Sequence, residues 1–392
     1  MSNSVLVNFP REAPRSPPVV GARRPAGVRS FGENDLEPVA DLFLQRFRAS
    51  GRGARAREEL AACMKALYLD HPTRDGEADA LVSVDADGAI AAFCGGVRAT
   101  FQFDGRPAKA CITGTLMASP APGHAMAALQ ILRERRRREY DLFVTDSANR
   151  SSLAICQASN YQVVSPDSLE WACVFDPASL ALHKVGQRLG LSWLRALRPL
   201  ARGADLAAGA AVRAAQGAGK PSGWRDAEVD AEAFVEIAPR FLEPYRLRPN
   251  FSKPEFLWLI DMAKRRRSAG PLHLRVIYDA AGTPAGAYAA FGGKGDVARV
   301  FHAVAAPHAW GRLFDKMRDS ARERGCIAIH GPLRQPMLAH AYSVRGVFFY
   351  YAGGMLAYSD RPEIRRAIAS GEAMLGGFAG DRWTQLASDH FG

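Results

Sequence analysis

The chain has 392 residues, 48% of them hydrophobic, which is long enough for two domains that each bury a core. Its 51 basic and 40 acidic side chains give a formal charge of +11. This charge implies an acidic partner, and nucleic acid, anionic lipid, coenzyme A phosphates or an acidic carrier protein would all serve. No apolar run approaches the roughly 20 residues that span a bilayer, and the N-terminus lacks the apolar core of a signal peptide. We therefore expect a cytoplasmic protein, either soluble or peripheral at the inner membrane surface.

The spacing of reactive residues disfavours several kinds of chemistry. The six cysteines are scattered and the nine histidines show no metal spacing, so we expect no zinc cluster, no disulfide framework and no permanently bound cofactor. No Gly-x-Ser-x-Gly or Gly-x-Gly-x-x-Gly segment occurs, which disfavours serine-hydrolase and dinucleotide chemistry. The basic runs at 133–138 and 264–267 fall at predicted helix C-termini, and no nucleic-acid signature accompanies them. A nucleic-acid partner is therefore not expected.

The N-terminal half begins with residues 1–27, whose prolines and arginines predict a disordered basic tail. The first folded unit then spans residues 28–176. Apolar residues at helical spacing and turn signals predict these elements: helices at 35–49 and 54–69, strands at 80–84, 89–95, 98–103 and 108–117, a helix at 123–138, a strand at 140–145, a short helix from 149 and a strand ending at 175. This order predicts a mixed α/β architecture.

Residues 177–226 form a basic, amphipathic linker. Between residues 179 and 220 several lysines and arginines accompany a single acid, Asp205, and leucines and Trp193 supply apolar surface. A basic helix of this composition can lie in the interface of an anionic membrane. It can equally pack on one of the domains with its charges solvated, and the sequence leaves both readings open.

The C-terminal half, residues 227–392, repeats the same order of elements. The predicted elements are helices at 231–242 and 253–267, strands at 272–278, 285–291 and 298–304, a helix at 309–324, a strand at 326–330, a short helix, and strands at 347–351 and 355–358. The two halves therefore look like a tandem repeat of one fold.

The most informative stretch is the turn Pro120–Ala125 between a strand and a helix, followed by the segment that Asn149 opens. A glycine at such a turn, here Gly123, lets the backbone pass close to a ligand, and amides at a helix N-terminus bind anions such as a pyrophosphate. The arrangement indicates a site for an acyl thioester.

These motifs resemble the GNAT acyltransferase superfamily, which pairs a pyrophosphate turn of the form Gln/Arg-x-x-Gly-x-Gly/Ala with a later segment Asn-x-x-Ala...Leu-Tyr-x-x-x-Gly-Phe. Gly123 and Ala125 match the turn, whereas Pro120 replaces its leading Gln or Arg. Asn149 matches the asparagine, and Cys156 stands where the family often keeps a catalytic tyrosine. The resemblance implies two tandem GNAT-like domains, each a mixed, mostly antiparallel sheet flanked by helices. It also implies acyl-CoA or an acyl carrier protein as co-substrate.

By this resemblance the first domain binds the donor. A break in strand pairing over 115–119 would let backbone amides hold the pantetheine arm and the thioester oxygen. The residues expected to contact the donor are Leu116, Met117, Ala118, Gly123, His124, Ala125 and Asn149. The counterpart turn of the second domain, 307–312, keeps Gly311 but carries the bulky Trp310, so that domain is expected to be the weaker coenzyme binder.

Acyl transfer to an amine also needs a base that removes a proton from the incoming ammonium. Asp146 is one candidate because it follows the strand that ends at 145, although an aspartate there could equally cap the next helix. His302 and His330, on or ending predicted strands, and Tyr342 in the short helix are the others; a strand histidine can instead be a satisfied core residue. Cys156 is interpreted as a buried thiol and not as a nucleophile.

The sequence therefore predicts an N-acyltransferase that moves an acyl group from acyl-CoA or an acyl carrier protein to an amine. The basic, apolar linker favours a long-chain or sphingoid-type lipid amine, and bacterial ceramide synthases are one GNAT-like group of this kind. N-acylation of an amino sugar in polysaccharide assembly is the alternative enzyme, and it predicts a polar acceptor cleft between the domains. A degenerate GNAT pair that binds lipid, carrier protein or nucleic acid without chemistry is the alternative outside the enzyme class, because Pro120 and Cys156 depart from the motif.

Overall fold

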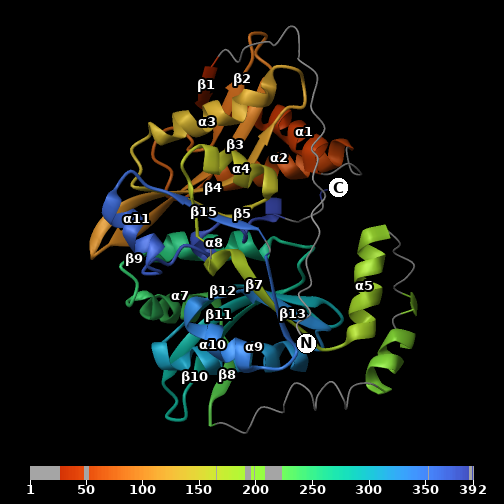
Figure 1. Cartoon of the computed structure of the whole chain (residues 1–392). Coiled ribbons are helices and arrows are strands. Elements are labelled where there is room, and N and C mark those ends of the chain that lie inside the picture. Colours follow the sequence, from red (N-terminus) through yellow and green to blue (C-terminus); the bar gives the residue numbers. More distant parts are fainter. Residues whose placement is uncertain are drawn as a thin grey trace, which may run out of the picture.

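The structure is a computed structural model that describes residues 27–47, 53–164, 166–189, 196–197, 199–207, 223–351, 353–387 and 391. The expected basic tail lies outside the described residues except for Gly27, and the expected linker is described only in part. Two sheets lie one above the other (Figure 1). The upper sheet has eight strands and the lower has seven.

The N-terminal half contributes most of the upper sheet. Its elements are β1 (Gly27–Ser30), α1 (Leu36–Phe47), α2 (Ala54–Tyr68), β2 (Leu81–Val84), β3 (Ile90–Phe103), β4 (Arg106–Ala118), α3 (Ala127–Arg136), β5 (Leu142–Ala148), α4 (Arg150–Ala158), β6 (Gln162–Val163), β7 (Leu169–Val174) and α5 (Pro177–Leu189). The two strands expected at 89–95 and 98–103 are one strand, β3, because the backbone between them keeps its pairing with β4.

The C-terminal half contributes most of the lower sheet. Its elements are β8 (Arg225–Glu228), α7 (Ala231–Ile237), a 3₁₀ segment (Ala238–Leu242), β9 (Leu247–Pro249), α8 (Lys253–Lys264), β10 (Leu272–Tyr278), β11 (Pro284–Phe291), β12 (Val297–Ala305), α9 (Trp310–Glu323), β13 (Ala328–Pro332), α10 (Leu338–Ser343), β14 (Val347–Tyr351), β15 (Gly354–Tyr358) and α11 (Pro362–Ala369). Ser252 begins α8 with a capping box, in which its hydroxyl accepts from Glu255 N and the Glu255 carboxylate accepts from Ser252 N.

Both sheets are mostly antiparallel. The parallel pairs are β4 with β5 and β12 with β13, at equivalent places in the two sheets. The expected fold class, a mixed α/β protein with two mostly antiparallel sheets flanked by helices, is confirmed.

The two halves exchange strands: the C-terminal half gives β15 and β9 to the upper sheet, where β9 pairs with the end of β3, and the N-terminal half gives β7 to the lower sheet. The upper sheet runs β1-β2-β3-β4-β5-β15-β6, so β15 of the C-terminal half lies between β5 and β6. The lower sheet runs β14-β7-β13-β12-β11-β10-β8, so β7 of the N-terminal half lies between β13 and β14. Each sheet is therefore completed by the other half of the chain. The domain limits 28–176 and 227–392 remain a prediction about where the repeat divides.

One apolar core joins the two halves. Its largest cluster combines Phe93 and Phe101 of β3 with Phe256 of α8, Phe301 of β12 and Phe378 of the C-terminal segment. Burying each such ring stabilises the fold by about 1.5–3 kcal/mol. The segment 373–387, which carries Phe378 and the buried Trp383, thus contributes to the packing of both halves.

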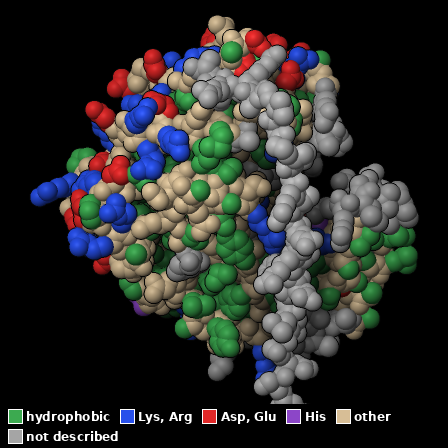
Figure 2. Space-filling view, turned by 45° about the horizontal axis from the view of Figure 1, so that its top comes forward, with side chains coloured by type: hydrophobic (Ala, Val, Ile, Leu, Met, Phe, Trp, Pro, Cys, Tyr) green, Lys and Arg blue, Asp and Glu red, His purple; other side chains and the backbone are tan. Residues whose placement is uncertain are grey.

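Charged side chains of both signs are mixed on the face shown in Figure 2. Basic and acidic groups are interspersed over its upper part and left edge, so the positive charge visible there is not gathered into one patch. Among the described residues, no helix is long and apolar enough to cross a membrane.

Candidate active site

The candidate site is built where β4 and β5 separate. These parallel strands pair only from Ala110 with Leu142 to Ile112 with Val144. Just beyond, Thr115 has a positive φ of 54°, and the register between β3 and β4 shifts so that Phe93 faces Met117 while Gly95 faces Gly114. This is a β-bulge, which leaves backbone groups of β4 without partners on β3. The break in pairing expected over 115–119 is therefore present at Thr115 and Leu116, whereas Met117 and Ala118 pair again with Phe93 and Ala92.

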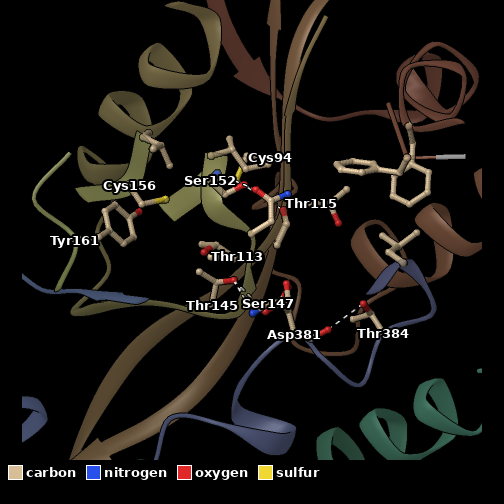
Figure 3. Close-up of a pocket in the computed structure, with 18 residues that line it drawn as sticks. Cys94, Thr113, Thr115, Thr145, Ser147, Ser152, Cys156, Tyr161, Asp381 and Thr384 are labelled. Atoms are coloured by element: carbon tan, nitrogen blue, oxygen red, sulfur yellow. Dashed lines mark hydrogen bonds between the residues drawn. The ribbon is translucent and has the colours of Figure 1, made fainter. Parts of the chain in front are cut away.

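A cavity of about 240 Å³ occupies this separation. Side chains from both halves of the chain line it, many with hydroxyl or thiol groups. The lining residues drawn and labelled in Figure 3 are Cys94, Thr113, Thr115, Thr145, Ser147, Ser152, Cys156, Tyr161, Asp381 and Thr384. Leu116 and Asn149 also line the cavity, and Phe43, Phe47 and Leu386 supply apolar surface.

Asp381, from the C-terminal segment, is the carboxylate in this cavity. It is 7% exposed and accepts hydrogen bonds from Thr145 Oγ1 at 3.0 Å, Asp146 N at 2.9 Å and the Ser147 hydroxyl. Burial, and then the neighbouring charge of Asp146, raise the pKa of Asp381 well above its ordinary value. A carboxyl group whose pKa moves toward neutral pH is suited to accept a proton from an ammonium group.

Two glycines allow β4 and the C-terminal segment to lie close to the buried aspartates. A Cβ atom on Gly114 would lie 2.7 Å from Asp381 Oδ2, and one on Gly380 would lie 2.3 Å from the Asp146 carboxyl group. Larger residues at these two positions would displace one carboxylate or the other.

Asp146, one of the candidate bases from the sequence, is buried beside Asp381 but does not line the cavity. Its Oδ1 accepts from the amides of Asp381 at 2.8 Å and Arg382 at 3.0 Å. It does not cap α4, because Asn149 does so by accepting from Ser152 N at 2.9 Å. Asp146 therefore anchors the segment that carries Asp381.

Arg382 connects this pair of aspartates to His330. Its Nε donates to Asp146 O at 2.5 Å, and its Nη1 forms an ion pair with Glu170 of β7. Glu170 Oε2 in turn lies 2.8 Å from His330 Nδ1 and accepts from the Tyr350 hydroxyl at 2.7 Å. Burial alone would raise the pKa of Glu170, but the hydrogen bond from His330 and the charge of Arg382 hold this pKa well below its usual range. The structure thus links two of the expected candidates, Asp146 and His330, through a buried polar chain.

The remaining two candidates lie elsewhere. His302 is buried in the joint core, where its ring lies 5.1 Å from that of Phe378. Tyr342 is 80% exposed on α10 and stacks on Phe349. Neither lines the cavity.

Of the expected donor contacts, Leu116 and Asn149 line the cavity. Met117 is buried and faces Phe93, whereas Ala118 is half-buried at the end of β4. Gly123, with φ 89°, precedes α3 as a left-handed residue, and Ala125 lies in the short 3₁₀ turn that follows it. The His124 ring is buried, with Nε2 3.4 Å from Asp85 Oδ2.

Tyr161 is a functional candidate that sequence reasoning did not single out. It lies beside Cys156 in Figure 3, and its buried hydroxyl has no hydrogen-bond partner among the residues that the structure describes. Burial raises the pKa of Tyr161 well above its ordinary value, so the group is a protonated phenol at neutral pH. Burial likewise raises the pKa of the Cys156 thiol to about 12, which agrees with a neutral thiol and not a nucleophile.

The sequence contains different signals for Tyr161 and for Asp381. Tyr161 falls inside the recognised segment, five residues after the cysteine that stands for the family's tyrosine. Asp381 is more than 230 residues from Asp146, and its only local signal is the cluster Gly376, Gly377 and Gly380, which predicts close backbone approach.

The equivalent register shift of the second half carries an aromatic side chain. β12 shifts register at Phe301, between the pairs formed by Ala289 and Ala290 of β11. The Phe301 ring packs against Phe291 at 5.1 Å and Phe378 at 5.0 Å. This packing favours the first half as the donor site.

Solved structures identify the fold. A probable N-acyltransferase from Enterococcus faecalis V583 matches with a TM-score of 0.52 and 12% identity, over 85% of this chain and 72% of that one. A GCN5-related N-acetyltransferase from Anabaena variabilis matches with a TM-score of 0.52 and 10% identity, over 84% and 72%. The chain has the GNAT fold.

Other comparisons add little to this assignment. N-myristoyltransferase from Saccharomyces cerevisiae matches over 91% of this chain and 86% of that one at 12% identity, with a lower TM-score of 0.46. The sequence matches no family model and no curated protein. Within the described part of the GNAT fold, no cluster of three or more His, Cys, Asp or Glu side chains is placed to hold a metal ion.

Proposed function

We propose that this protein is an N-acyltransferase that transfers an acyl group from acyl-CoA to an amine. The observation that carries the proposal is the cavity at the separation of β4 and β5, which contains a buried carboxyl group, Asp381, and a buried phenol, Tyr161. A GNAT pair that only binds would not need both a proton acceptor and a proton donor in one cavity.

The reaction assigns a role to each group. The thioester carbonyl lies at the bulge, where backbone amides near Leu116 hold its oxygen. Asp381 takes a proton from the incoming ammonium, and the free amine attacks the carbonyl carbon. The C–S bond then breaks, Tyr161 gives its proton to the leaving thiolate, and the nitrogen returns its second proton to the Tyr161 oxygen as the amide forms. The N-terminus of α3, after Gly123, offers amides to the pyrophosphate of the donor.

Two features of the structure bear on the class of amine that accepts the acyl group. The hydroxyl groups of Thr113, Thr115, Thr145, Ser147 and Ser152 support a polar acceptor, such as an amino sugar. Exposed apolar side chains at the linker, Val185, Leu200 and Leu206, support instead a long-chain amine presented at an anionic membrane. An acidic acyl carrier protein is the alternative donor. The panel of substrates below distinguishes these classes.

The test measures thiol release by purified protein with short- and long-chain acyl-CoA, with and without amino-sugar, sphingoid and amino-acid acceptors, and identifies products by mass spectrometry. We expect acceptor-dependent release. Asp381→Asn should lower kcat on the order of 10²-fold at pH 7 while leaving KM for acyl-CoA within about twofold, because the base acts after donor binding. The control is Asp75→Asn, since the Asp75 side chain is 92% exposed.

The wild-type pH profile gives a second readout. Because the pKa of Asp381 is raised, its carboxylate form, and with it the rate, should grow as pH rises through neutrality. Absence of thiol release with every donor, together with no rise in Tm on adding acyl-CoA, would refute the enzyme proposal. Full activity of Asp381→Asn would refute the role of this base.

A further inference from the structure

A second cavity, of about 270 Å³, lies between the far end of β3 and the second half of the chain. It shares no lining residue with the cavity at β4 and β5. Gln102 at the end of β3, the 3₁₀ segment Ala238–Leu242, Asn250 after β9, Phe256 of α8 and His302 of β12 border it. Nothing in the proposed acyl transfer uses this cavity.

The interior of the second cavity is apolar apart from one histidine. Leu242, Phe251 and Phe256 line it together with His302, which is 3% exposed. His302 Nδ1 has no hydrogen-bond partner among the described residues and is buried against the backbone of Gly377, so a ligand in the cavity would meet the other side of the ring, at Nε2. Burial lowers the pKa of His302 to about 3, so the ring is neutral and carries one donor and one acceptor.

The rim of the cavity is basic. Arg240 and Arg248 line it with one acid, Glu243. Arg248 Nη1 donates hydrogen bonds to Glu243 O at 2.8 Å and Tyr245 O at 2.6 Å. With the amide of Gln102 turned so that its oxygen faces Arg248, this oxygen accepts from Arg248 Nε at 2.6 Å and Nη2 at 2.8 Å. Arg240 Nε donates to Glu236 O at 3.2 Å. All of these acceptors are uncharged carbonyl or amide oxygens. In the described part of the chain, these bonds therefore pair neither guanidinium with a carboxylate.

We propose that this cavity binds a small carboxylic acid with an apolar, ring-like body and a hydroxyl group at its far end. The ring packs on Phe251 and Phe256, the hydroxyl meets His302, and the carboxylate lies between Arg240 and Arg248. Charge-assisted bonds to two arginines favour an anion over its neutral analogue. The site is independent of the acyl-transfer proposal.

A matched series of probes tests the proposal by isothermal titration calorimetry on the full chain. The probes are 4-hydroxyphenylacetate, phenylacetate without the hydroxyl, the neutral 4-hydroxyphenylacetamide and the cation tyramine. We expect 4-hydroxyphenylacetate to bind with a Kd on the order of 100 μM, and loss of either the hydroxyl or the charge to weaken binding about tenfold. Tyramine should bind most weakly.

Variants locate the binding. Arg240→Gln should abolish the preference for the carboxylate over the amide, and Asn250→Trp at the exposed rim should block all four probes. Arg345→Gln, an exposed arginine elsewhere, is the control and should bind like the wild type. His302→Phe should remove the preference for the hydroxyl, and the two rim variants test the site even where this core substitution prevents folding. The proposal would be overturned if 4-hydroxyphenylacetate did not bind at millimolar concentration. It would also be overturned if Arg240→Gln and Asn250→Trp both bound the probes as tightly as the wild type.

Discussion

At the scale of single residues, Tyr161 combines an unsatisfied hydroxyl with a place in the cavity. Its ring packs 5.3 Å from that of Tyr358 on the exchanged strand β15, while its hydroxyl has no hydrogen-bond partner in the described part of the chain. A tyrosine kept only for packing gains nothing from such a hydroxyl, because phenylalanine would fill the same space without a buried polar group.

Tyr161→Phe therefore separates a catalytic from a structural role. We expect kcat to fall by roughly 10- to 100-fold with the best acyl-CoA and amine, because the leaving thiolate loses its proton donor. The free energy of unfolding should stay within about 0.5 kcal/mol of wild type or rise. Steady-state kinetics and urea unfolding measure the two effects. Unchanged kcat, or a loss of stability that accounts for the lost activity, would contradict the role of the phenol.

Glu170 gives the acid stability of the molecule a specific source. Its pKa is lower in the folded protein than the ordinary value of 4.5, so the folded state binds fewer protons than the unfolded state in that range. The stabilisation by Glu170 is thus fully present above about pH 4.5 and is lost as pH falls through the folded pKa. Glu170→Gln should cost about 3–5 kcal/mol at pH 7, because Arg382 loses its buried partner.

The measurement is urea unfolding of wild type and Glu170→Gln at pH 7 and at several values below pH 4.5. The difference between them should shrink on acidification, whereas the exposed control Glu323→Gln should differ from wild type by less than about 0.5 kcal/mol throughout. A difference that stays constant with pH would show that the ionised form of Glu170 is not what stabilises the fold.

At the scale of elements, the turn before α3 has a direct test. Gly123 and Gly105 both have positive φ, 89° and 77°, so alanine strains the backbone at either position. Gly105 lies in the turn between β3 and β4, away from the cavity. Both substitutions should lower stability by about 1–2 kcal/mol. Only Gly123→Ala should raise KM for acyl-CoA, by roughly tenfold, because it distorts the amides that face the pyrophosphate.

Calorimetric binding of CoA to the two variants checks this prediction without relying on turnover. Equal CoA affinity in Gly123→Ala and Gly105→Ala would mean that the turn does not hold the donor. A stability loss in one variant alone would show that the two glycines are not a matched pair.

Most elements could be predicted because their signals are local. The apolar spacing of 35–49 gave α1, and the glycine in the turn 120–125 gave the entrance to α3. Hydrogen-bond partners far apart in the chain give no such signal. The pairing of β15 with β5, and the contact between Asp381 and Asp146 over 235 residues, depend on the tertiary fold. For this reason Asp146 was recognised as a candidate and the carboxylate beside it was not.

At the scale of the whole molecule, the exchanged strands unite the two repeats. Removal of β15 would leave β5 and β6 without the strand that lies between them. Removal of β7 would do the same to β13 and β14. The polar chain from Asp381 through Arg382 to Glu170 also crosses from one half to the other. The candidate site is thus assembled only when both halves fold together.

We therefore expect the halves not to fold alone. Residues 27–176 and 223–392, each produced separately, should give broad amide NMR spectra and no cooperative thermal transition, because each leaves a buried sheet edge unpaired and divides one apolar core. The full chain should unfold in one transition. Mixing the fragments under refolding conditions should restore dispersed signals and, with acyl-CoA and the best amine, thiol release. A fragment with a dispersed spectrum of its own would show that strand exchange is not required for folding, and would place the repeat limits at the boundaries expected from the sequence.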